Sequence, residues 1–262
     1  PMQADIRHLL ETAAHAPVVR LFLDYDGTLA DFAPTPDTIL PDAALIDLLK
    51  RLAQAPGILP AVISGRRLAH IRTLLPLPGL LLAGTYGVEM MLPEGEIRHI
   101  LRLADVRPVM ERVLGGWRKM LAERQSFYLE DKGWSVALHG RYADAAAAAE
   151  VFPAARELLQ SIAPVEDYRI LGGDKFLELV PMQAGKPAAV NWILEEQTPA
   201  GAMVVYLGDD DKDEEAFAAV QAAGGSAIRV AACPVQTGAA YRLASPQDVR
   251  SWLNVLLSMR VS

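Results

Sequence analysis

The sequence is poor in cysteine and slightly short of positive charge. Cys233 is the only cysteine in 262 residues, which excludes a disulfide within the chain and a multi-cysteine zinc or iron–sulfur site. A chain without disulfides suits a reducing compartment, so we expect a cytoplasmic protein. The 25 Lys and Arg are outnumbered by 32 Asp and Glu. This balance argues against a nucleic-acid partner, since a phosphate backbone needs a basic surface.

Long hydrophobic runs are also absent. The longest uncharged stretches, such as residues 73–88, are too short to cross a membrane and are interrupted by proline and glycine. Residues 1–17 lack the basic start and apolar middle of a signal peptide. With 52% hydrophobic and 22% charged residues, the composition is ordinary for a globular protein. We therefore expect neither a membrane nor a nucleic-acid partner, and we take a monomer as the simplest state.

Short apolar strands alternate with amphipathic helices at both ends of the chain. The expected strands lie at residues 18–23, 58–63, 80–83, 203–207 and 227–230. The expected helices lie at residues 41–53, 66–75, 186–196, 212–222 and 245–257. Such alternation is typical of a parallel sheet with helices on both faces. The sequence predicts an α/β fold with a doubly wound, mostly parallel, Rossmann-like sheet.

The middle of the chain has a different pattern. After a hairpin at residues 88–101, the expected elements are a helix at 106–122, a hairpin at 126–139, a helix at 143–161 and a hairpin at 168–180. This helix–hairpin–helix–hairpin order predicts an antiparallel α+β domain. We expect it to be inserted at residues 105–180 between two parts of the core, residues 1–104 and 181–262.

Two aspartates directly follow the first strand, in the segment DYDGT at residues 24–28. Ligands of open α/β sheets bind beyond the carboxyl ends of the strands, so Asp24 and Asp26 lie where chemistry is expected. Paired carboxylates suit a hard cation such as Mg²⁺, and one of them can attack phosphorus while the other moves a proton. An ordinary polar turn is the plainer interpretation of this segment. The probability that four fixed residue types match by chance is roughly 1 in 10⁵ per start position, which favours the functional interpretation.

A second acidic segment, GDDDKDE at residues 208–214, follows the strand at 203–207. Clustered carboxylates repel one another unless a cation or solvent relieves them. An EF-hand loop is excluded, because the sixth position from Asp209 is Glu214 rather than glycine. An acidic first turn of a helix is the alternative, which we assign to Glu214 and Glu215 but not to Asp209.

Two further segments are weak signals by themselves. Residues 64–66 (SGR) form a strand-to-helix junction, where a hydroxyl and backbone N–H groups can hold a phosphate. The same residues are also an ordinary helix N-cap. Gly185 and Lys186 open a helix without a Walker A pattern, and a single lysine is most often a surface charge.

In this order, the four segments resemble the motifs of the haloacid dehalogenase superfamily of phosphatases. More narrowly, the chain resembles the trehalose-6-phosphate phosphatases. Residues 129–141 and 173–179 are similar to cap segments of that family, and residues 208–217 (GDDDKDEEAF) to its GDDxTDExAF segment. The resemblance covers residues 18–245. It departs from the family pattern at Tyr86, Gly140, Val180 and Lys212, which puts the sugar in question more than the reaction.

The resemblance implies a Mg²⁺-dependent phosphatase acting on a sugar phosphate, with trehalose 6-phosphate first, through an aspartyl-phosphate. It makes Asp24 the nucleophile, Asp26 the general acid and base, and Lys186 the group that offsets developing charge. The implied metal ligands are Asp24, the Asp26 backbone carbonyl and Asp209, with Asp210 and Asp213 behind them. The implied phosphate-binding residues are Gly27, Thr28, Ser64, Gly65, Arg66 and Lys186.

The inserted domain would then be a cap domain that recognises the sugar and excludes water. Its candidates for hydrogen bonds to sugar hydroxyls are Glu130, Lys132, His139, Arg141, Lys175 and Glu178. Glu178 is informative, because a carboxylate among apolar neighbours is costly unless it is paired or lies on a polar face. For each of the six candidates taken alone, an exposed position on the cap surface without a function is the plainer interpretation.

Three other functions stay open at this stage. Within the superfamily, the substrate could be a glucosyl- or mannosylglycerate phosphate or sucrose phosphate. A non-catalytic, regulatory sugar-phosphate-binding subunit predicts a damaged acidic site, whereas Asp24, Asp26, Lys186 and Asp209 are all present. A nicotinamide-dependent oxidoreductase is poorly supported, since no G-x-G-x-x-G follows the first strand.

Overall fold

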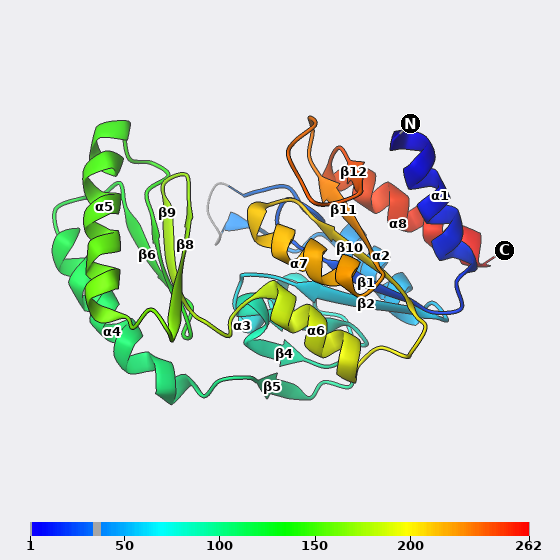
Figure 1. The fold of residues 1–262 in the computed structure, drawn as a ribbon, viewed down its shortest axis with the longest axis horizontal. Helices are drawn as coiled ribbons and strands as arrows, with labels where there is room; N and C mark the ends of the chain where they lie inside the picture. The colour runs from blue at the N-terminus through cyan, green and yellow to red at the C-terminus, as the bar shows by residue number, and fades with distance from the viewer. Residues whose placement is uncertain (1, 34–37, 262) are drawn as a thin grey trace. The chain divides into compact units, whose positions relative to one another are not determined.

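The computed structural model describes residues 2–33 and 38–261 and contains two compact units. The core unit comprises residues 1–98 and 185–262, and the cap unit comprises residues 99–184. Figure 1 shows the elements of both units along the chain. The fold is α/β with a mostly parallel sheet and a separate antiparallel sheet, as the sequence predicts.

The core unit is built on an eight-stranded sheet with the order β12-β11-β10-β1-β2-β3-β4-β5. The strands on one side of the switch point are β1 (Val19–Leu23), β2 (Ile58–Ile63), β3 (Leu81–Gly84), β4 (Glu89–Met91) and β5 (Ile97–His99). Those on the other side are β10 (Met203–Gly208), β11 (Ser226–Val230) and β12 (Tyr241–Leu243). Strands β12 to β3 are parallel, and β4 is antiparallel to β3. The strand order reverses between β10 and β1, where ligands of such sheets bind.

Helices cover both faces of this sheet (Figure 1). They are α1 (Met2–His15), α2 (Ala43–Gln54), α3 (Leu68–Leu74), α6 (Lys186–Glu196), α7 (Asp211–Ala222) and α8 (Pro246–Val261). On β1, Leu21 and Leu23 pack with α2 and α8, while Phe22 packs on the opposite face with α6 and α7. A strand buried on both faces needs apolar residues at successive positions, which explains the continuous apolar run of β1.

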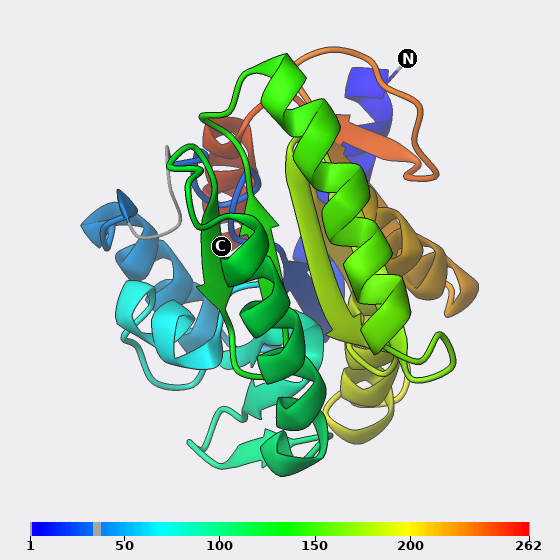
Figure 2. The same cartoon turned by 90° about the vertical axis from the view of Figure 1, so that its left-hand side faces the viewer.

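The cap unit pairs a four-stranded antiparallel sheet with two helices. Its strands are β6 (Tyr128–Asp131), β7 (Val136–His139), β8 (Tyr168–Gly173) and β9 (Phe176–Pro181), in the order β6-β7-β9-β8. The helices are α4 (Leu103–Met120) and α5 (Ala145–Ile162). Both cover one face of the sheet (Figure 2), where Leu138 and Leu179 join Trp117 and Leu159 in a separate hydrophobic core.

The borders between the units lie outside the range 105–180 expected from the sequence. The His99 ring packs on Trp134 at 5.0 Å, and the Leu101 carbonyl accepts a hydrogen bond from Trp134 Nε1 at 2.9 Å. At the other border, Arg169 donates to the Ala184 carbonyl at 2.9 Å. These contacts attach residues on both sides of the expected domain to the cap unit.

Among the α-helices and strands of the described residues, α1 and β12 have no counterpart among the expected elements. Strand β12 is only three residues long, and each of its residues is half-buried, so its sequence carries little periodicity. Helix α1 places Leu9 and Ala13 against the core, a spacing of one helical turn. No helix in residues 2–33 and 38–261 has the length and apolarity needed to cross a membrane.

Candidate active site

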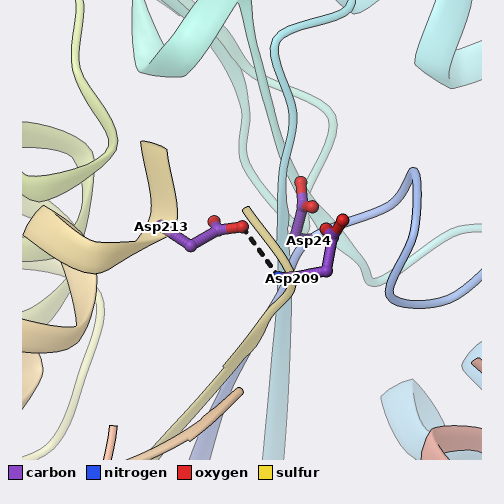
Figure 3. A group of neighbouring side chains, drawn as sticks. All are labelled: Asp24, Asp209 and Asp213. Atoms are coloured by element: carbon purple, nitrogen blue, oxygen red, sulfur yellow. Dashed lines mark hydrogen bonds between the residues drawn. The ribbon is translucent and has the colours of Figure 1, made fainter. Parts of the chain in front are cut away.

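The carboxyl ends of β1 and β10 bring two acidic segments together. The two strands pair in parallel with Leu23 opposite Leu207, and the Asp24 backbone N–H donates to the Leu207 carbonyl at 3.0 Å. Asp24 follows β1, and Asp209 follows β10. Carboxylate oxygens of Asp24, Asp209 and Asp213 lie within 4.8 Å of one another (Figure 3).

Burial makes this group of carboxylates electrostatically costly. Burial, and then the charge of Asp213, raise the pKa of Asp24 well above its ordinary value against the opposing effect of Lys186. Burial also raises the pKa of Asp209 to about 6. A set of close, buried carboxylate oxygens that ionise with difficulty fits a hard divalent cation such as Mg²⁺, because its charge would favour ionisation.

Asp213 differs from the other two in that protein donors occupy its carboxylate. Its Oδ1 accepts from Lys186 Nζ at 2.6 Å and from Tyr206 Oη at 2.7 Å. Its Oδ2 accepts from the backbone N–H groups of Asp209 at 3.0 Å and Asp210 at 3.2 Å. A carboxylate has about four acceptor positions, so Asp213 suits a supporting role better than a metal-binding one.

Lys186 is buried at the start of α6 rather than on the surface. Its Nζ lies 2.9 Å from Asp24 Oδ1 as well as 2.6 Å from Asp213 Oδ1. Burial opposes its charge, but Asp213 and Asp24 outweigh this effect and raise the pKa of Lys186 well above its ordinary value. Lys186 is therefore a permanent ammonium beside the candidate nucleophile.

Asp210 forms the N-cap of α7. Its side chain accepts from the Asp213 backbone N–H, and the two residues form a reciprocal capping box. Burial works against its ionisation, yet the charges of Lys186 and Lys212 hold the pKa of Asp210 below its ordinary value. Lys212, a departure from the family pattern, thus contributes a charge near the acidic loop, with Nζ 3.7 Å from Asp210 Oδ2.

The loop after β1 depends on glycine at one position. Gly27 has a φ of +79°, and a Cβ at this position would collide with the Asp209 carboxylate. The tight approach lets Thr28 Oγ1 donate to Asp209 Oδ1 at 3.1 Å. Gly27 and Thr28 therefore lie at the acidic cluster.

Asp26 and Arg66, which are expected to have separate roles, form an ion pair. The Arg66 guanidinium donates through Nε to Asp26 Oδ2 and through Nη2 to Asp26 Oδ1, each at 2.7 Å. His70 Nδ1 lies 3.2 Å from Arg66 Nη1. The Ser64 hydroxyl accepts from the Arg66 backbone N–H at 3.0 Å. The structure thus places Arg66 on the candidate general acid rather than open to a phosphate.

The turn after β3 packs against the loop that contains Ser64, Gly65 and Arg66. None of the sequence motifs reveals this contact. Thr85 and Tyr86 have φ values of +48° and +55°, unusual for residues with a side chain. Glu89 holds this turn by accepting from Thr85 Oγ1 at 2.8 Å. The Tyr86 ring occupies the space beside Gly65, where a Cβ would lie 2.6 Å from Tyr86 Cε1. In the sequence, Tyr86 is visible only as a departure from the family pattern. Nothing in the sequence indicates that its φ is positive.

Two pairs form among the cap candidates. His139 Nε2 lies 2.9 Å from Glu130 Oε2, and its ring stacks on Tyr128 with centroids 4.5 Å apart. Glu178 is fully buried, with Oε1 2.9 Å from Lys132 Nζ and 2.8 Å from the Ser135 hydroxyl. The buried carboxylate therefore has the partner that its cost of burial requires.

The other two cap candidates lie near the ends of strands. Lys175 has a φ of +51° in the β8–β9 turn, and its Nζ donates to the Ala143 carbonyl at 2.6 Å. Arg141 is exposed just beyond β7. Directly before Arg141, Gly140 leaves space for Phe127 and Phe152, whose rings meet edge-on at 6.0 Å. This pair fills the place where the family pattern has an aromatic residue.

Comparisons with known proteins agree with these motifs. A family model described as Trehalose-phosphatase matches residues 22–247. The trehalose-phosphate phosphatase of Mycobacterium marinum is 32% identical over 204 residues, which cover 76% of this chain and 51% of that protein. The chain thus spans about half the length of the curated relatives it matches.

Solved structures show the same fold over the full chain. An Aspergillus fumigatus trehalose-6-phosphate phosphatase structure is 26% identical with a TM-score of 0.68, covering 97% of each chain. The C-terminal domain of a Candida albicans trehalose-6-phosphate phosphatase reaches a TM-score of 0.83 at 19% identity, also over 97% of each chain. At this identity the second likeness supports the fold alone.

Proposed function

Because the chain belongs to the trehalose-phosphatase family, we propose that it is a phosphatase that hydrolyses trehalose 6-phosphate to trehalose and phosphate. The observation that carries the proposal is the contact of Lys186 Nζ with Asp24 Oδ1 at 2.9 Å, inside a buried acidic cluster. A nucleophile beside a fixed cation at a strand end suits attack on a phosphoryl group. A non-catalytic role gives no reason to keep this costly arrangement.

Asp24 acts as the nucleophile in this proposal. One of its carboxylate oxygens forms a bond to phosphorus, and the bond from phosphorus to the sugar oxygen breaks. Asp26 gives its proton to the leaving sugar oxygen. In the second step, Asp26 takes a proton from water, whose oxygen attacks phosphorus and releases phosphate from Asp24. Lys186 offsets the charge on the phosphoryl oxygens, which Thr28, Ser64 and the backbone near Gly27 and Gly65 help to hold.

The ion pair with Arg66 constrains the role of Asp26. The guanidinium donates to both oxygens of Asp26 in a fork, which fixes the orientation of the carboxylate. Asp26 must therefore act from this orientation or exchange its partner when the sugar phosphate binds. Arg66 would thus orient Asp26 for both proton transfers, in addition to any contact with phosphate.

A magnesium ion fits the same residues. The carboxylates of Asp24 and Asp209 and the backbone carbonyl of Asp26 would hold it, with Asp210 and Asp213 supporting them from behind. The ion would supply positive charge for the phosphoryl oxygens and for the clustered carboxylates.

The cap unit would supply the sugar contacts. The carboxylate of Glu130 can accept from sugar hydroxyls, and Lys132 and His139 can donate to them. Glu178, which is fully buried, would support Lys132 in this role. Lys175 and Arg141 would add charged donors. Because Glu130 pairs with His139 and Glu178 with Lys132, these side chains are already oriented by their partners.

A substrate panel tests the proposal. Phosphate release is measured with trehalose 6-phosphate, sucrose phosphate, and glucosyl- and mannosylglycerate phosphates, each with Mg²⁺ and with a chelator. We expect the highest kcat/KM with trehalose 6-phosphate, and loss of activity with the chelator. No release above background from trehalose 6-phosphate, alongside turnover of another sugar phosphate, would replace the substrate and keep the reaction class.

A further inference from the structure

Tyr206 brings a phenol hydroxyl from the hydrophobic core to the acidic cluster. Its fully buried ring on β10 stacks on Phe22 of β1, with centroids 5.9 Å apart and an interplanar angle of 27°. It meets Phe217 of α7 edge-on at 5.6 Å. Rings packed on both sides leave the phenol little freedom, so the core determines where its hydroxyl lies.

The partner of this hydroxyl is Asp213 Oδ1, at 2.7 Å. The same oxygen accepts from Lys186 Nζ at 2.6 Å. The other oxygen accepts from two backbone N–H groups, those of Asp209 and Asp210. Donors on four sides hold the carboxylate in one orientation, and Tyr206 is the neutral side chain among them.

The orientation of Lys186 follows from that of Asp213. An ammonium group has three N–H bonds, and Lys186 directs one to Asp24 and one to Asp213. Two fixed hydrogen bonds set the rotation about the Cε–Nζ bond and leave one direction for the third N–H. If Asp213 rotates, this N–H turns away from its direction, and the loop at Asp209 loses a support.

Tyr206 also shares the oxygen that attracts Lys186. A donated proton from the phenol takes up part of the negative charge on Oδ1. Without it, Asp213 attracts the ammonium more strongly and draws it from Asp24. Both effects act on the group that offsets phosphoryl charge, and neither involves the cap unit.

We propose that Tyr206 is a positioning residue of the phosphoryl-transfer site, which acts through Asp213 on Lys186 without touching the substrate. The inference rests on the phosphatase function proposed above and adds a residue that none of the sequence motifs contains.

Tyr206→Phe tests it by removing the hydroxyl and keeping the ring. We expect kcat to fall about tenfold with both trehalose 6-phosphate and p-nitrophenyl phosphate, because misplacement of a group at the reacting centre costs up to about 10²-fold. The two factors should agree, since the substrates share the phosphoryl group. KM should stay within about twofold, and the melting temperature should show a folded protein.

Tyr241→Phe, on the edge strand β12, is the matched control and should leave kcat unchanged.

A double-mutant cycle separates positioning from a general loosening of the core. Asp213→Asn alone should lower kcat with p-nitrophenyl phosphate, and adding Tyr206→Phe should lower it little further. Asp213→Asn also serves as the second variant if Tyr206→Phe fails to fold. An unchanged kcat in Asp213→Asn would contradict the inference.

Other outcomes are equally decisive. An unchanged kcat in folded Tyr206→Phe, or independent effects of the two substitutions, would overturn the inference. A wild-type chain that hydrolyses p-nitrophenyl phosphate but not trehalose 6-phosphate would contradict the proposed sugar substrate instead. The role of Tyr206 would still be decided by the p-nitrophenyl phosphate measurements.

Discussion

At the residue scale, the acidic cluster gathers more negative charge than its lysine balances. Lys186 contacts both Asp24 and Asp213, and Asp209 lies within 4.8 Å of these carboxylates. Burial raises the pKa of Asp209 to about 6 and that of Asp24 well above its ordinary value. The free protein therefore tolerates this cluster at a cost that depends on pH and on bound cations.

The pKa of Asp209 predicts how stability depends on pH. The pKa is about 6 in the folded chain, against an ordinary value of 3.8 for an aspartate. Between these values the folded state binds more protons than the unfolded state, so the stability of the metal-free protein falls as pH rises from about 4 to 6. Mg²⁺ favours the ionised form, so it should raise the melting temperature more at pH 7 than at pH 5. Thermal unfolding with MgCl₂ and with a chelator measures both effects.

Asp209→Asn is the control for this pH effect. It removes the titrating carboxylate, so the gain from Mg²⁺ should be smaller and depend less on pH. A gain from Mg²⁺ in the wild type that is equal at both pH values would show that Asp209 does not take part in cation binding.

Asp24→Asn should nearly abolish turnover without unfolding the protein. The amide keeps the shape of the side chain but cannot form the acyl phosphate, so kcat should fall about 10³-fold or more. Removing a buried charge should leave the metal-free melting temperature equal or higher. Phosphate release and circular dichroism measure the two outcomes, and turnover at the wild-type rate would remove Asp24 from its role.

Arg66→Lys distinguishes two roles for the arginine. Lysine keeps the charge but cannot bind both oxygens of Asp26 in a fork. We expect kcat with trehalose 6-phosphate to fall about tenfold, with a smaller effect on release of p-nitrophenol, whose leaving oxygen needs no proton. Steady-state rates and the burst of p-nitrophenol measure this difference.

Arg67→Lys, at the exposed neighbouring position, is the matched control and should leave both rates unchanged. If Arg66→Lys instead raises KM equally for the two substrates at constant kcat, Arg66 serves chiefly to bind the phosphoryl group.

At the scale of elements, local patterns predict the strands and the segments that follow them. The apolar runs that become β1 and β10 are readable because both faces of these strands are buried. The acidic residues after them are then placed at the same edge by the rule for parallel sheets. Local periodicity and turn residues also predict the helices and hairpins of the cap unit.

Partner choice within the site is not readable in this way. Asp26 and Arg66 are 40 positions apart, and Asp24 and Lys186 are 162 apart. Their contacts depend on strand register and on rotamers fixed by neighbours such as Tyr206. The capping box of α7 fixes Asp210 at the N-cap, and Asp213, one turn later, is the residue that meets Lys186.

The buried pair on β9 and the β6–β7 turn supports the cap sheet. Glu178→Gln removes the buried carboxylate that pairs with Lys132, so the free energy of unfolding of the cap unit should fall by about 3 kcal/mol. Glu150→Gln, in an exposed pair with Arg124, should cost less than about 1 kcal/mol. Chemical denaturation measures both. Equal losses of unfolding free energy would mean that the buried Lys132–Glu178 pair stabilises the protein no more than an exposed pair does.

At the scale of the whole molecule, the cap unit has a hydrophobic core of its own, centred on Trp117, Leu138 and Leu159. We expect residues 99–184 expressed alone to fold and to unfold cooperatively, as measured by circular dichroism. Residues 105–180 should be less stable, since they lack the contacts of His99 and Leu101 with Trp134. Equal stability of the two fragments would place the functional border where the sequence suggested.

The insertion also sets the order in which the protein can be assembled during synthesis. Strand β1 emerges from the ribosome before the cap unit, but its neighbour β10 begins only at Met203, after the entire cap unit. Until then, one edge of β1 has no partner, and Asp209 and Asp213 have not been made. A chain released between the end of the cap unit and Met203 would carry a complete cap unit and an incomplete phosphoryl site. Activity therefore reports that the segment from Lys186 to Asp213 has been made and has returned to β1.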